Sequence, residues 1–79
     1  METFRTITAE AADYNITISI NQFGDIEFQD INGNILAQMF RREGRTWAGV
    51  TSEPEATGKK IGTKAAVADW CMDWAANGF

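Results

Sequence analysis

Residues 14–29 read YNITISINQFGDIEFQ, and this stretch decides the expected fold. Apolar and polar side chains alternate strictly over residues 14–21 and again over residues 25–29, which is typical of strands with one buried face. The three residues between the two runs end in Gly24 and suit a hairpin loop in which that glycine is left-handed. The sequence therefore predicts an antiparallel pair of strands here.

The loop at residues 22–24 fixes the register of these strands, pairing Ile20 with Ile26 and Ile18 with Phe28. The next turn is expected at Asn32-Gly33, because this dipeptide is the strongest signal for a two-residue hairpin turn. It adds a third strand through these pairs: Asp30 with Ile35, Phe28 with Ala37, and Ile26 with Met39. A meander with one apolar face follows.

The turn at residues 42–45 leads into a fourth segment that contains Trp47, and two registers fit it. A two-residue loop pairs Phe40 with Trp47 on the outer face of the sheet and turns Val50 inward. A three-residue loop pairs Met39 with Trp47 and buries the indole. Because a slip of one residue exchanges the two faces of a strand, the registers make opposite predictions for Trp47.

A C-terminal helix is predicted from Lys64, with Thr63 as its N-cap and Asn77-Gly78 as its stop. Its apolar side chains recur at helical spacing and form one stripe, which consists of Val67, Trp70, Cys71 and Trp74. We expect this stripe to dock on the apolar face of the sheet.

The remaining segments have weaker patterns. Residues 51–62 hold the only proline, two glycines and four charges, so we expect a loop. Residues 1–12 are expected to form an edge strand followed by a short turn. The predicted fold class is α+β, with residues 1–79 as a single domain. In it, a three- to four-stranded antiparallel β-meander packs against one C-terminal α-helix.

Composition argues against several classes of function. The chain of 79 residues has no histidine and a net charge of −4, and its one cysteine, Cys71, lies on the apolar stripe. The commonest general base is therefore missing and the thiol is expected to be inert, so we predict no enzymatic activity, cofactor or metal. A lone cysteine and the lack of an apolar run of about 20 residues favour a cytoplasmic location without a membrane span.

An apolar group on the outer sheet face indicates a protein partner. Its expected members are Leu36, Phe40, and either Trp47 or Val50. The alternative is that Phe4 and Ile7 cover this face. A homodimer through the same face is a further alternative.

Acidic side chains lie in two places that a partner could contact. Asp25, Glu27 and Asp30 lie along the second strand, side by side with the apolar group on the outer sheet face, and Asp69 and Asp73 lie four residues apart on the exposed side of the helix. Carboxylates in these places suit a basic, nucleic-acid-handling protein surface. The helix side is the competing location for the site.

Basic residues give the alternative function, a nucleic-acid-binding module. Lys59, Lys60 and Lys64 stand beside the expected start of the helix, where phosphate contacts are favoured, and three arginines are available as well: Arg41, Arg42 and Arg45. The net negative charge makes this alternative weaker than a protein partner.

Two resemblances bear on these readings. Gly44-Arg45-Thr46-Trp47 and Gly58-Lys59-Lys60, with Thr63-Lys64-Ala65-Ala66 after them, resemble the strand-loop-helix end of double-stranded RNA-binding domains and of phage integrase arm-binding domains. No first helix is predicted, in contrast to the RNA-binding family. In size, charge and lack of catalytic residues, the chain resembles the small acidic anti-defence proteins of phages and mobile elements, anti-CRISPR proteins included. That resemblance implies an inhibitor that blocks a host defence complex sterically, in the host cytoplasm.

Overall fold

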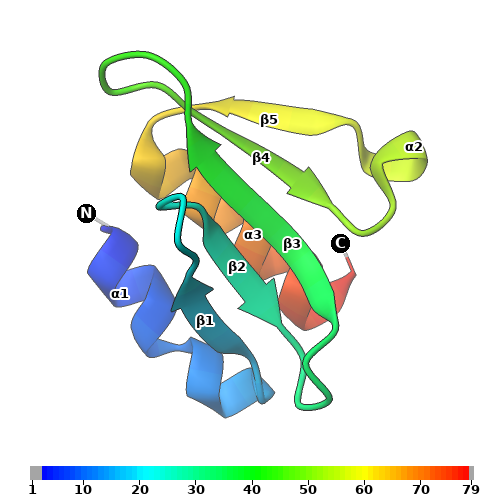
Figure 1. The fold of residues 1–79 in the computed structure, drawn as a ribbon. Coiled ribbons are helices and arrows are strands. Elements are labelled where there is room, and N and C mark those ends of the chain that lie inside the picture. Colours follow the sequence, from blue (N-terminus) through cyan, green and yellow to red (C-terminus); the bar gives the residue numbers. More distant parts are fainter. Residues whose placement is uncertain (1–2, 79) are drawn as a thin grey trace.

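The computed structural model describes residues 3–78. In chain order its elements are α1 (Phe4–Ala9), the 3-10 helix η1 (Ala11–Tyr14), β1 (Thr17–Ile20), β2 (Ile26–Gln29), β3 (Ile35–Arg41), β4 (Trp47–Thr51), α2 (Pro54–Thr57), β5 (Lys59–Gly62) and α3 (Lys64–Asn77). The strands form one antiparallel sheet in sequence order, and α3 crosses one face of it (Figure 1). The α+β class is confirmed, with five strands instead of three or four.

The first hairpin has the predicted register. Ile18 pairs with Phe28 and Ile20 with Ile26, and Gly24 has a φ of +83°. The first strand is shorter than expected, because the chain leaves η1 through Asn15, whose φ is +58°. Tyr14 therefore belongs to η1 and not to the strand.

The second hairpin closes through a three-residue loop at residues 31–33, not through a two-residue turn. The N–H of Asp30 donates to the carbonyl of Asn34 at 2.9 Å, so the expected pair of Asp30 with Ile35 is wrong. A bulge between Phe28 and Gln29 absorbs the extra residue. The predicted pairs deeper in the strands, such as Phe28 with Ala37, are consequently found.

The third hairpin has neither of the two expected registers. Trp47 pairs with Arg41. The three-residue loop had paired Trp47 with Met39, two residues away from Arg41 on β3. Because side chains alternate between the two faces of a strand, a shift of two residues keeps Trp47 on the same face. Trp47 therefore packs against the core on the α3 side, as the three-residue alternative predicted, whereas Val50 lies on the outer face.

The N-terminal segment is a helix, so the predicted edge strand is wrong. Thr3 caps α1: the N–H of Thr6 donates to Thr3 Oγ1 at 3.3 Å, and Thr6 Oγ1 accepts from the N–H of Thr3 at 2.9 Å. Ile7 is buried and Phe4 packs against the core. In Figure 1, α1 lies beside α3 on the same side of the sheet. The structure therefore has a helix in this segment, where the sequence predicted none.

Residues 51–62 are not a plain loop. They contain the short helix α2 and the fifth strand, β5, which pairs with β4 along Trp47–Gly62, Ala48–Ile61, Gly49–Lys60 and Val50–Lys59. Thr51 and Thr57 fix the connection, because their hydroxyl oxygens lie 2.7 Å apart. β5 was missed because an edge strand with adjacent lysines has no apolar alternation.

Helix α3 has the predicted bounds. Thr63 Oγ1 accepts the N–H of Ala66 at 3.2 Å, and the left-handed Gly78 donates its N–H to Trp74 O at 2.8 Å. Val67 and Cys71 are fully buried against the sheet, and the two tryptophans of the stripe are partly buried. Ala68 and Met72 are buried as well, because α1 covers a second side of the helix.

Gly49 of β4 lies directly beneath α3. A Cβ at this position would stand 2.8 Å from Val67 Cγ1 and 2.9 Å from Cys71 Sγ, which are both closer than atoms in real structures approach. We therefore expect Gly49→Ala to lower the free energy of unfolding by about 1–3 kcal/mol, measured by urea denaturation.

Gly62→Ala is the matched control, since its Cβ would meet only Ala66 Cβ, at 3.9 Å. We expect a change within about 0.5 kcal/mol for this variant. Equal losses in the two variants would contradict the close approach of α3 to β4.

Candidate functional site

Within residues 3–78, no helix lies over the sheet face opposite α3. Figure 1 shows α1 and α3 on the far side of the sheet, with the near face of β1 to β5 open. Alternate side chains of the strands point to this face. Its apolar members, which we call the outer apolar group, are Leu36, Phe40, Ala48, Val50 and Ile61.

Three members of the outer apolar group form a continuous row. Phe40 pairs with Ala48, and Ala48 pairs with Ile61, so the row crosses β3, β4 and β5. Ala48 is only 2% exposed, because it lies between two larger side chains, whereas Ile61 is 46% exposed. The alternative in which Phe4 and Ile7 cover this face is wrong, because both belong to α1 on the α3 side.

A polar network adjoins the outer apolar group on β1 and β2. Glu27 accepts hydrogen bonds from Asn21 Nδ2 at 3.2 Å and from Gln29 Nε2 at 3.0 Å. The same Gln29 nitrogen lies 3.4 Å from Ser19 Oγ. These bonds hold the Glu27 carboxylate in one place, one strand away from Gln38 of β3. Glu27 is thus the predicted acidic residue that the structure brings to this face in a fixed position.

Asp30 stabilises the loop between β2 and β3 through hydrogen bonds. Its Oδ1 accepts the N–H groups of Asn32 and Asn34, both at 2.9 Å, and its Oδ2 accepts from Asn34 Nδ2 at 3.1 Å. The hydrogen bonds from Asn34, first the backbone bond and then the side-chain bond, lower the pKa of this exposed carboxyl from its usual 3.8. The carboxylate has a structural role that its place in the sequence did not indicate.

Two other predicted partner residues, Trp47 and Asp25, lie near one end of the sheet. Trp47 is on the face opposite the outer apolar group, against the core. Asp25 lines an open depression of about 460 Å³ with Phe23, Arg41 and Trp47, at the end of the sheet where two hairpin tips adjoin. Of the two residues expected to complete the apolar group, Val50 and not Trp47 therefore lies on the outer face.

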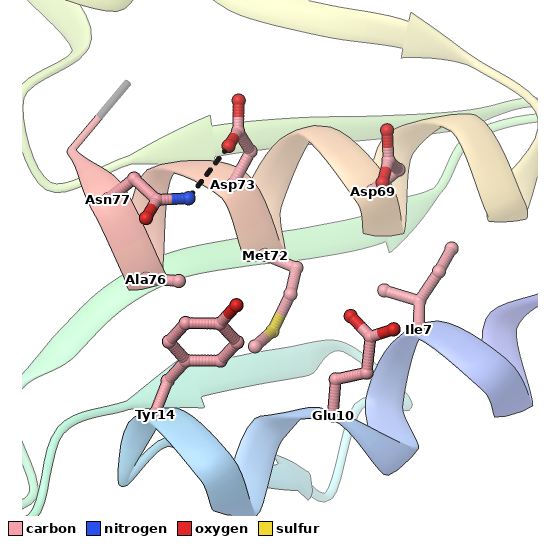
Figure 2. A pocket seen from close by; sticks show the side chains of 8 residues that line it. All are labelled: Ile7, Glu10, Tyr14, Asp69, Met72, Asp73, Ala76 and Asn77. Atoms are coloured by element: carbon pink, nitrogen blue, oxygen red, sulfur yellow. Dashed lines mark hydrogen bonds between the residues drawn. The ribbon is translucent and has the colours of Figure 1, made fainter.

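Asp69 and Asp73 belong to a second surface, between α3 and the α1–η1 segment. They line a groove of about 280 Å³ that also includes Glu10, Tyr14 and Met72. Figure 2 shows Glu10 and Tyr14 reaching toward α3 with Met72 between them, and a hydrogen bond from Asn77 to Asp73. Sequence reasoning missed Glu10 and Tyr14 because their position depends on α1 and η1 being helical.

The three lysines of the nucleic-acid alternative do not converge. Lys59 and Lys60 are adjacent in β5 and therefore point to opposite faces of the sheet. Lys64 has aromatic neighbours instead: its Nζ lies 4.4 Å from the ring centroid of Phe4 and 5.3 Å from that of Trp47. These cation–π contacts join α1, β4 and the start of α3.

Lys64 does gather with two of the predicted arginines. It lines an open cavity of about 500 Å³ together with Arg41, Arg45 and Trp47, next to the first turn of α3. The side chains of these arginines have no hydrogen bond or ion pair among residues 3–78. We call the site of Arg41, Arg45, Lys64 and Trp47 the basic corner. It differs from the predicted cluster of three lysines.

Three further features of residues 3–78 bear on the kinds of site that this part of the chain can hold. Burial raises the pKa of the Cys71 thiol to about 12. In this part of the chain, no group of three or more histidine, cysteine or carboxylate side chains is placed to hold a metal ion. None of the helices described here has the length and apolar character to cross a membrane.

The role of Asp30 can be tested through pH. Because the folded-state pKa is lowered, the carboxylate stabilises the hairpin above pH 3.8, and this contribution is lost as the pH falls through the folded-state pKa. Asn21 makes the equivalent bonds in the first hairpin through its amide oxygen, at 2.9 Å to Phe23 N and 3.0 Å to Asp25 N. Asp30→Asn should therefore keep the loop but remove its titration.

We expect the melting temperature of the wild type to exceed that of Asp30→Asn at neutral pH, and the difference to shrink as the pH is lowered below 3.8. Thermal melts of both proteins across the acid range provide the measurement. A difference that stays constant with pH would show that the charge of Asp30 has no part in the hairpin.

No protein-family model, curated protein or solved structure matches this chain.

Proposed function

We propose that this chain is a protein-binding module that docks on its partner through the outer apolar group. The observation that carries the proposal is the row of Phe40, Ala48 and Ile61 on a sheet face that none of the described helices covers. Covering such a row with a partner removes apolar surface from water, which is the main favourable term in protein association. Inhibition of a host defence complex by steric blockade, as the resemblance to anti-CRISPR proteins implies, is the specific form of this proposal.

Glu27 supports the proposal through charge. Its carboxylate is already held by Asn21 and Gln29, so the Glu27 side chain loses little conformational freedom when it binds a cationic group of a partner. A fixed negative charge beside apolar anchors favours a partner surface that combines apolar and basic groups. The charge contributes mainly to the rate of encounter, and the apolar anchors to the lifetime of the complex.

Capture experiments with variants of single residues test this proposal. We expect Ile61→Gln and Phe40→Gln to reduce recovery of a partner from host lysate by roughly tenfold or more, because central apolar anchors carry most of the binding energy. Quantitative mass spectrometry of the bound fraction provides the measurement. A melting curve of each variant shows whether it remains folded.

The double variant Asp69→Lys with Asp73→Lys is the control, because these residues belong to the groove between α1 and α3. It should retain the partner. If the double variant loses the partner and the sheet variants keep it, the groove is the interface and the proposal for the sheet face is wrong.

Contact with nucleic acid is a second candidate function, and the basic corner of Arg41, Arg45 and Lys64 is the observation that favours it. Cations around an aromatic side chain suit phosphates and exposed bases. Binding to duplex DNA and RNA should then weaken linearly with the logarithm of salt concentration, and Arg45→Ala should reduce that slope by about one. Fluorescence anisotropy at several salt concentrations makes this measurement, and undetectable binding at low salt eliminates the candidate.

A further inference from the structure

The two edges of the sheet differ in how they are protected. β5 carries Lys59 and Lys60, and charged side chains are a common device that prevents another strand from adding to an edge. β1, at the other edge, reads Thr-Ile-Ser-Ile and has neither a charge nor a proline. Within residues 3–78, β1 has β2 as its only neighbouring strand. The β1 edge is therefore open to a further strand.

The hydrogen-bonding groups of this edge can be assigned from the hairpin. Asn21 donates its N–H to Asp25 O at 2.9 Å, so its backbone points toward β2. Because the direction alternates along a strand, Thr17 and Ser19 also point toward β2, whereas Ile18 and Ile20 point away from the sheet. Ile16 fits the same alternation, since its N–H points outward and donates to Ala11 O at 2.9 Å. Among residues 3–78, no strand or turn pairs with the outward N–H and C=O groups of Ile18 and Ile20.

An apolar groove of about 450 Å³ lies along this edge, between β1 and the α1–η1 segment. Ile18 and Ile20 form one wall, and Phe4 and Ala11 belong to the other. Ile20 is 69% exposed, which is unusual for an isoleucine in a strand. A strand added to β1 would place alternate side chains in this groove. Its backbone would pair with the outward groups of Ile18 and Ile20, and its side chains would contact the apolar wall.

The charges around the edge distinguish between occupants. Carboxylates lie near both ends of β1: Asp13 belongs to η1, just before the strand, and Asp25 lies opposite Asn21, just after it. A second copy of this chain would bring a second set of the same carboxylates to the junction, and like charges oppose such pairing. A segment with basic residues is favoured by the same charges.

We propose that β1 accepts an extended segment of a partner protein as a sixth strand, with apolar side chains of that segment in the groove and basic residues at its ends. This site is distinct from the outer apolar group, because it uses the edge of the sheet and not its open face. It goes beyond the proposed function in defining a backbone-mediated mode of binding and the sequence character of the bound segment.

Amide hydrogen exchange of the full chain, followed by NMR, tests the proposal. The probe is a short synthetic peptide with alternating valine and threonine and a lysine at each end, blocked at both termini. We expect the peptide to slow exchange at the amides of Ile18 and Ile20 by roughly tenfold or more, because they change from free donors to bonded ones. A peptide with glutamate in place of both lysines should bind at least about tenfold more weakly.

Two lysine substitutions form a matched pair. Ile20→Lys places a protecting charge on the open edge, and we expect it to weaken binding of the lysine-ended peptide by roughly tenfold. Ile31→Lys is the control, since Ile31 is also an exposed isoleucine, at 78%, but lies in the loop between β2 and β3. It should leave binding unchanged. Ile20→Val, which retains the apolar character of the side chain, should keep the affinity and show that the loss is not general.

Three outcomes would overturn the proposal. The first is a peptide that fails to bind at millimolar concentration, or that binds without slowing exchange at Ile18 and Ile20. The second is equal binding of the lysine-ended and glutamate-ended peptides. The third is slow exchange at these amides in the free protein together with a dimer in sedimentation, which would make a second copy the occupant. Phe40→Gln should still bind the peptide, so failure of the sheet-face proposal is distinguishable from failure of this one.

Discussion

The contact of α3 with Gly49 is the constraint on which the other packing depends. With no Cβ at this position, Val67 and Cys71 lie directly against the backbone of β4, and the helix sits deep on the sheet. A helix at this depth leaves room for α1 beside it, so α3 is buried on two sides and Met72 joins the core as well as Val67. In a chain of 79 residues, this two-sided burial supplies core that the sheet alone could not.

The same arrangement determines which surfaces are left open. Both α1 and α3 occupy one side of the sheet, so neither of these helices covers the apolar row on the other side (Figure 1). Placing α1 next to α3 also creates the acidic groove of Figure 2 and the apolar groove along β1. The candidate surfaces are thus consequences of a helical N-terminal segment more than of any single motif.

The elements that could be predicted are those whose signals are local and repeated. The alternation over residues 14–29 with Gly24, and the capped helix from Thr63 to Gly78, each combine a periodic pattern with a specific end signal. The helix α1 was not predictable in this way, because its threonines favour strands in isolation and its cap is a reciprocal bond between Thr3 and Thr6. Glu27 was correctly placed on the outer face by alternation alone. The role of Asp30 and the groove that Glu10 and Asp69 both line depend on loop length and helix packing, which the sequence does not encode locally.

Because Cys71 is buried, the rate at which its thiol reacts with a reagent measures how often the structure opens. The sulfur is enclosed between α3 and the sheet, and a pKa near 12 leaves almost none of it as the reactive thiolate at neutral pH. A thiol-specific reagent can therefore react at an appreciable rate only when α3 separates from β4. The reaction rate of the wild-type chain would report how often the helix leaves the sheet, with no engineered label and no competing cysteine. A partner that binds the closed form would slow this reaction in proportion to its occupancy, so the same thiol offers a binding assay that requires no knowledge of where the partner docks.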